Sequence, residues 1–166
     1  YTVANGVQAY EDVADVYWKY LGDAWEVGSD DVSMTLTLPV PQGVEVTPGQ
    51  NVRAWGHGPL DGTLSVNADG SVTYQVPHVN AGQYAEAHVV FPVDWLSNLP
   101  AESKLLHQSE MHLDTVLQDE RVWADQANAR RSIAFGTTVA GLALCVVMLL
   151  VALVLFLRFG TEHQPA

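Results

Sequence analysis

The chain has a single cysteine, Cys145, and it lies inside a long apolar run near the C-terminus. A water-exposed domain in the rest of the chain can therefore hold neither a disulfide nor a cysteine-ligated metal. We expect such a domain to be stabilised by the burial of apolar side chains.

Basic residues are also scarce, with 7 Lys and Arg against 19 Asp and Glu and a net charge of −12. All but one of the acids and all but one of the bases precede Ile133. Contacts to phosphate groups need clustered Lys and Arg. We therefore expect no nucleic-acid partner.

Charged residues are missing altogether between Ile133 and Leu157. At about 1.5 Å per residue this run is about 37 Å long as a helix, which exceeds the roughly 30 Å of bilayer hydrocarbon. The sequence predicts a transmembrane helix over 133–158, with 159–166 as the start of a cytoplasmic tail. The lipid bilayer is thus an expected partner.

Small residues lie at helical spacing within this run. Gly136 with Ala140, and Thr137 with Gly141, would let another helix approach closely, although such spacings are common by chance. The oligomeric state stays open. Cys145 would act as a small hydrophobic residue, because lipidation normally occurs nearer the interface.

Glycine and proline are absent from 101–131, a segment rich in Glu, Leu, Gln and Ala. This composition predicts a helical stalk, and nothing before Ile133 would break the helix. Its apolar stripe is interrupted by Ser109 and Glu120, which favours packing on a domain over a long coiled coil. The stripe comprises Leu106, Leu113, Val116, Leu117, Trp123 and Ala127.

Residues 1–99 contain several short strand patterns separated by Gly and Pro. Apolar residues alternate with polar ones from Val32 to Leu38, and the Thr63–Val66 and Ser71–Val76 patterns flank a turn with Gly70 free to be left-handed. We predict a mainly β fold, an antiparallel β-sandwich of immunoglobulin-like architecture, followed by the stalk and one transmembrane helix.

The acidic and aromatic segment from Glu11 to Val27 is expected to cover one end of the core. Glu11, Asp12 and Asp15 could form a glycosidase carboxylate cluster, but no partner stands at a definable spacing. A solvated rim is the favoured interpretation.

Tryptophans are the other large side chains, and two interpretations stay open. They could form a sugar-stacking or partner-binding face, or they could fill a disulfide-free core. We expect at least three of the following to be mainly buried: Trp18, Trp25, Trp55 and Trp95.

His57 is the leading candidate for a site residue, because flanking Gly56 and Gly58 would leave its imidazole accessible. With Arg53 and Trp55 it makes a possible ligand or partner surface. The favoured alternative is that the glycines shape a turn, with Trp55 packed and Arg53 capping carbonyls or pairing with an acid.

The remaining histidines before the membrane segment are scattered, at 78, 88, 107 and 112. Two pairs could bind a metal only if the fold brought them together, and HxH and HExxH spacings are missing. No nucleophile motif or phosphate loop is present. We therefore expect no metal site, no cofactor, no catalytic residue and no enzyme; in particular, an enzyme using Arg53 and His57 would lack a nucleophile or acid.

Ordered aromatic and glycine motifs resemble those of the bacterial YciQ-like family of predicted membrane proteins, a family of unknown function. The motifs are Tyr17–Gly22 with Trp25, Val52–Leu60 with Gly62, Trp95-Leu96, and Trp123 with Asn128–Arg130. The resemblance implies a β-rich domain outside the cytoplasmic membrane, preceded by a signal or anchor and followed by membrane spans. Residues 1–99 would then be the C-terminal portion of that extracytoplasmic domain. No known chemistry is implied.

The arginines beside the apolar run oppose this orientation. Arg121, Arg130 and Arg131 precede the run and only Arg158 follows it, whereas cytoplasmic flanks normally carry the excess. We give the resemblance more weight, because the excess of Lys and Arg on the cytoplasmic side is counted over the flanks of all membrane segments of a full-length protein.

The function that these features favour is a binding or scaffolding module at the cell envelope, with other membrane or envelope proteins as partners. The alternative is the ectodomain of a transport or signalling assembly, coupled through the stalk to the membrane helix.

Overall fold

The computed structural model describes residues 3, 6–96 and 109–160. It divides into two compact units, Tyr1–Glu120 and Arg121–Ala166. The first unit is the β domain, which also includes the first turns of a long helix. In the second, the described residues are the remainder of that helix, which ends at Phe159, and Gly160.

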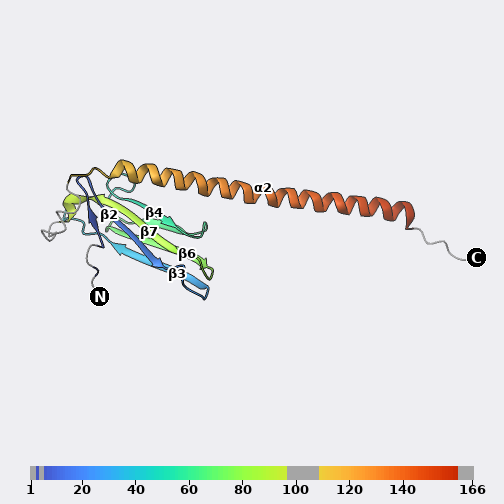
Figure 1. The fold of residues 1–166 in the computed structure, drawn as a ribbon, viewed down its shortest axis with the longest axis horizontal. Helices are drawn as coiled ribbons and strands as arrows, with labels where there is room; N and C mark the ends of the chain where they lie inside the picture. Colours follow the sequence, from blue (N-terminus) through green and yellow to red (C-terminus); the bar gives the residue numbers. More distant parts are fainter. Residues whose placement is uncertain (1–2, 4–5, 97–108, 161–166) are drawn as a thin grey trace, which may run out of the picture. The chain divides into compact units, whose positions relative to one another are not determined.

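The described part of the β domain has two antiparallel sheets (Figure 1). Sheet A has the order β1-β2-β7-β4, and sheet B has the order β3-β6-β5. The predicted β-sandwich is confirmed, while its immunoglobulin-like architecture stays a prediction. The strands are β1 (Gln8–Ala9), β2 (Val13–Leu21), β3 (Ser29–Thr37), β4 (Arg53–His57), β5 (Thr63–Val66), β6 (Ser71–Val79) and β7 (Ala85–Pro92), followed by a short 3-10 helix, η1 (Val93–Trp95).

The core lies between the sheets and is built from alternate residues of each strand. Val72 and Tyr74 of β6 face Ala87, Val89 and Phe91 of β7, and all five are buried. Gly70 has φ +83° in the β5–β6 turn, the left-handed conformation that the sequence predicts there. Apolar packing therefore holds the sheets together, as expected of a domain without disulfides.

Three of the four tryptophans are more than half buried, as expected, and Trp25 is the exception. Trp95 is buried, but Trp18 and Trp25 are 37% and 57% exposed and Trp55 is half-buried. Trp95 packs in the core beside Phe91, with ring centroids 6.0 Å apart.

The prediction that Glu11–Val27 covers one end of the core is wrong, because most of this segment is the nine-residue strand β2 of sheet A. It pairs with β7 along nearly its whole length, from Val13↔Pro92 to Leu21↔Ala85. Its Asp15 and Lys19 interrupt the apolar pattern from which a strand would be predicted. Both lie on the face of sheet A that points away from the core.

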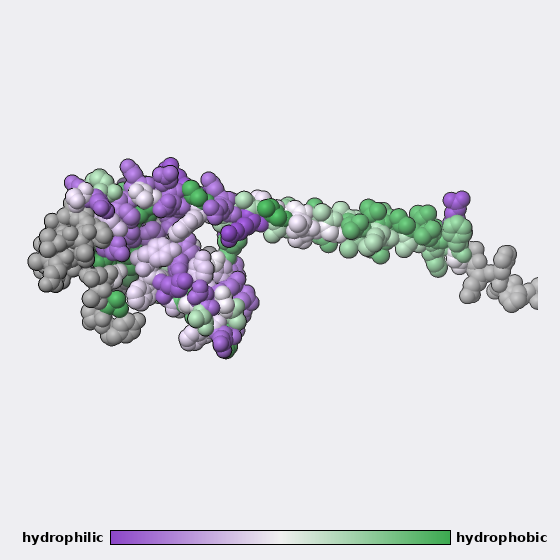
Figure 2. All heavy atoms as spheres, viewed as in Figure 1, coloured by the Kyte–Doolittle hydropathy of each residue, from purple (hydrophilic) through white to green (hydrophobic). Residues whose placement is uncertain are grey.

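Helix α2 (Leu113–Phe159) runs for 47 residues without a break, as the sequence predicts. Its start differs from the prediction, since Ser109–His112 are not helical and 101–108 lie outside the described residues. It is the one described helix long and apolar enough to cross a membrane. Its apolar side chains from Ile133 to Leu157 are exposed, and Figure 2 shows them as a green surface.

Candidate functional site: a histidine and carboxylate network

The outer face of sheet A carries polar side chains from three neighbouring strands. The register places Tyr17 and Trp55 on either side of His88, and Lys19 and His57 on either side of Glu86. Residues at these positions point away from the core, because their chain neighbours Ala87, Val89 and Ala54 pack into it. The face is thus polar in its middle.

The first turns of α2 cover this face. Leu113 and Val116 pack against Val13 and Val90 in a small apolar cluster. The Asp12 carboxylate accepts hydrogen bonds from the backbone N–H groups of His112 and Leu113, at 2.9 and 3.0 Å. This cap stabilises the start of the helix at Leu113, since it satisfies N–H groups that have no partner within the helix.

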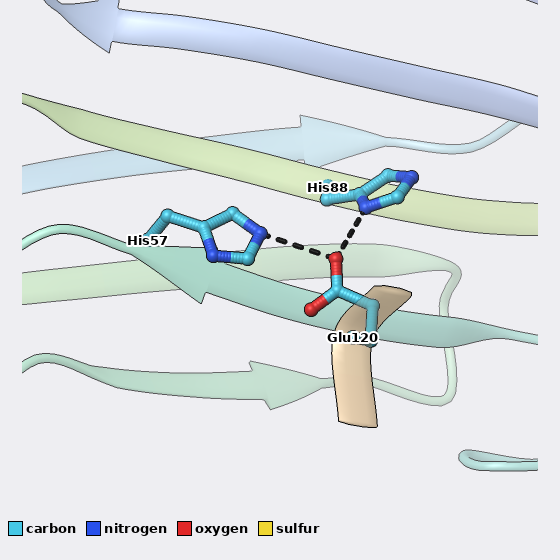
Figure 3. Close-up of side chains that lie close together, drawn as sticks. All are labelled: His57, His88 and Glu120. Atoms are coloured by element: carbon cyan, nitrogen blue, oxygen red, sulfur yellow. Dashed lines mark hydrogen bonds and ion pairs between the residues drawn. The ribbon is translucent and has the colours of Figure 1, made fainter. Parts of the chain in front are cut away.

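Glu120, one turn after Val116, reaches two histidines of the sheet (Figure 3). Its Oε1 lies 3.1 Å from Nε2 of His57 and 2.6 Å from Nδ1 of His88. The three donor atoms lie within 4.8 Å of one another. His88 and Glu120 are only 6% and 5% exposed, so this cluster is largely withdrawn from water.

Asp15 holds the other side of the His88 ring. Its Oδ1 is 3.0 Å from His88 Nε2, but the two buried atoms are poorly aligned, so within the described part of the chain neither has a well-directed hydrogen bond. Its Oδ2 is 3.1 Å from Nε2 of His112, whose ring stacks on Tyr10. His88 therefore stands between two carboxylates.

Tyr17 and Glu86 complete the network. The Tyr17 hydroxyl donates to Glu86 Oε2 at 2.6 Å, and Lys19 Nζ lies 3.3 Å from the other carboxylate oxygen. The Tyr17 ring stacks beside His57, with centroids 5.8 Å apart. The rings of His57 and His88 are thus both in contact with the Tyr17 ring.

The electrostatics favour an imidazolium at His88. Burial lowers its pKa, but the contacts and charges of Asp15 and Glu120 raise it more, to about 9. Burial also raises the pKa of Glu120, and its hydrogen bonds with His57 and His88 outweigh this and lower the pKa. The pKa of Tyr17 is raised by burial and by its bond to Glu86.

The sequence singled out His57 but missed most of its partners. Asp15 was expected in a solvated rim, and this was wrong, since it is 9% exposed. Glu120 was visible only as an interruption of the apolar stripe, and His88 only as a histidine within a strand. The expectation of no metal site stays untested, but the premise that the histidines are scattered fails for His57 and His88.

The structure separates the three residues of the predicted ligand surface into two places. Arg53, Trp55 and His57 share one face of β4, yet only His57 lies in the cluster with His88 and Glu120. Arg53 and Trp55 border an open groove of about 430 Å³ beside β5. The turn interpretation is partly right, because Gly58 has φ +140° and a Cβ there would lie 2.5 Å from the Tyr84 carbonyl oxygen.

The other predicted positions are outside this network. Ile133, Gly136, Gly141, Cys145 and Leu157 all lie in α2, and a Cβ at either glycine would meet nothing within 4 Å. His78 pairs with Asp30 at the surface of sheet B. His107 lies outside the described residues.

Comparison with known proteins places the chain by family alone. No curated protein matches it. No solved structure matches it. The family model described as the N-terminal domain of predicted membrane proteins, DUF2207, matches residues 1–91, more than half of the sequence. Together with the apolar helix, this match makes the chain a membrane protein that belongs to the DUF2207 family.

Proposed function

We propose that the chain is a membrane-anchored binding or scaffolding module of the bacterial cell envelope, with its β domain outside the cytoplasm. The observation that supports binding is the exposure of aromatic side chains in the β domain. Trp25 is 57% exposed and Tyr84 is 39% exposed. Aromatic rings offer large rigid contact area and are enriched at protein interfaces.

These two aromatics lie on adjacent loops. The Trp25 carbonyl accepts the Gly82 N–H at 3.0 Å, so the β2–β3 and β6–β7 loops lie side by side. Lys19 Nζ lies 4.8 Å from the centre of the nearby Tyr84 ring. Lys19 is itself paired with Glu86 and Asp23. What the loop pair offers a partner protein is therefore aromatic area, which suits an apolar or aromatic patch.

Orientation is tested with single cysteines at Asp69 and Thr161 in a Cys145→Ala background of the full-length protein. Intact cells are labelled with a membrane-impermeant maleimide. Labelling at position 69 alone is the expected result. Labelling at position 161 alone would put the β domain in the cytoplasm and overturn the envelope role.

Binding is tested by placing a photo-crosslinking amino acid at Trp25 in living cells, with Asp69 in the β5–β6 turn as the matched exposed control. We expect a discrete crosslinked species at position 25 and none at 69. Equal or absent crosslinking at both positions would count against a partner surface at these loops.

The alternative, a transport or signalling ectodomain, is favoured by one observation. Helix α2 is unbroken from Leu113, which is capped by Asp12, to Phe159 in the apolar segment. Inserting two prolines after Ala127 would break this helix. Loss of complementation of a deletion strain with membrane retention intact would favour coupling, and full complementation would favour a passive anchor.

A further inference from the structure

We infer that His57, His88 and Glu120 form a binding site for one divalent transition-metal ion, with Zn²⁺ as the best-fitting ion. The proposal concerns a different part of the β domain from the aromatic loops. It does not depend on what those loops bind.

The donor set is the first argument. Two imidazole nitrogens and one carboxylate oxygen converge within 4.8 Å. Two histidines and a glutamate are a known three-ligand set for zinc, with a fourth position taken by water or another molecule. Mg²⁺ and Ca²⁺ bind oxygen ligands and fit this site poorly, because two of its three donor atoms are nitrogen.

The spacing is the second argument. In a tetrahedral zinc site the bonds to N and O are about 2.0–2.1 Å, so donor atoms lie roughly 3.3 Å apart. Glu120 Oε1 is already 3.1 Å from His57 Nε2 and 2.6 Å from His88 Nδ1. The two histidine nitrogens lie within 4.8 Å of each other, and rotation of the imidazole rings would bring them closer by up to about 1.5 Å to reach that geometry.

Asp15 supplies the third argument. A histidine that binds metal through Nδ1 has Nε2–H left to donate, and such rings usually donate to a carboxylate, which sets the tautomer and orientation. Asp15 Oδ1 lies 3.0 Å from His88 Nε2. Among the described residues these two buried atoms have no well-directed hydrogen bond, and a small rotation of the ring would align them.

The positions of the ligands are the fourth argument. His57 and His88 come from hydrogen-bonded neighbouring strands, and Glu120 comes from a helix whose first turn is capped by Asp12. Tyr17 holds the rings of His57 and His88 from the side. The donors are therefore positioned by sheet and helix rather than by a loop, as a preorganised site requires.

The test uses the full chain in detergent micelles, without a histidine tag and stripped of metal with a chelator. Zn²⁺ is titrated against a competing chromogenic chelator, and Mg²⁺ and Ca²⁺ serve as ion controls. We expect one equivalent of Zn²⁺, with affinity at least tenfold lower in His57→Gln and in Glu120→Gln. His78→Gln removes an exposed histidine of sheet B and is expected to bind like the wild type.

A spectroscopic readout separates loss of the site from loss of the fold. Co²⁺ bound to the wild type should give the intense visible bands of a tetrahedral site, and these should vanish in Glu120→Gln while its far-ultraviolet circular dichroism is unchanged. Stoichiometric binding that is equal in wild type and both variants, or no stoichiometric binding in the wild type, would overturn the proposal.

Discussion

Glu120 Oε1 lies 2.6 Å from His88 Nδ1, so a carboxylate in the second turn of α2 closes on an imidazole in the middle of β7. Both side chains are about 95% buried, and they are 32 residues apart in the sequence. The contact joins the start of the helix to the sheet. The stability of the β domain and its dependence on pH are therefore expected to depend on this contact.

Glu120→Ala should destabilise the β domain. It removes one carboxylate from a buried His88 that is cationic in the metal-free protein, and breaking one side of a buried ion pair costs about 3 kcal/mol or more. Glu120→Gln keeps an acceptor oxygen and should cost less. Chemical denaturation of the full chain in micelles with chelator present would measure this, and an unchanged midpoint for Glu120→Ala would contradict it.

Stability of the metal-free protein should fall at alkaline pH. The folded pKa of His88 is raised from 6.5 to about 9 by Asp15 and Glu120, so its stabilisation is complete below pH 6.5 and is lost as pH rises through 9. By linkage the loss is on the order of 3 kcal/mol at most. The ionisable side chains that face the His88 ring, and so set its pKa, are Asp15, Glu120, His57 and Tyr17.

The same network predicts a fall at acid pH. The pKa of Glu120 is lowered from 4.5, so its stabilisation is present above that pH and is lost as pH falls through the lower folded value. Denaturation midpoints measured from pH 3 to 10 should therefore pass through a maximum. A midpoint that rises steadily from pH 7 to 10 would be the contrary result.

Asp12→Ala should loosen the start of α2. Its carboxylate accepts two backbone N–H groups, those of His112 and Leu113, and loss of such a cap costs about 1–2 kcal/mol. Hydrogen exchange at residues 112–116 should become faster. Asp61→Ala is the control at an exposed acid, and equal exchange in both variants would show that the cap is unimportant.

Gly58→Ala should be far more harmful than Gly82→Ala. Both residues have positive φ, but a Cβ at Gly58 would lie 2.5 Å from the Tyr84 carbonyl oxygen, whereas at Gly82 it would meet nothing within 4 Å. We expect losses of about 3 and about 1 kcal/mol, because only the first adds a backbone clash to the φ strain. Similar thermal midpoints for the two variants would refute this.

Local patterns were sufficient where one physical rule decides the structure. The alternation of β3 and the turn at Gly70 gave the sandwich, and an uncharged run of bilayer length gave the helix of Ile133–Leu157. They failed for β2, because Asp15 looks like a solvent-facing residue until the start of α2 is known to cover it. They also did not single out Trp25 as the exposed tryptophan, since side-chain size does not say which positions the sheets enclose.

By itself the sequence determined that this is a β domain without disulfides, attached to a helix long and apolar enough to cross a membrane, because composition and periodicity are local properties. Only the tertiary structure decided that His57, His88 and Glu120 meet. His57 and Glu120 are 63 residues apart and no local spacing links them. They come together because β4 pairs with β7 and because Asp12 and the cluster around Val116 place the start of α2 on the outer face of sheet A.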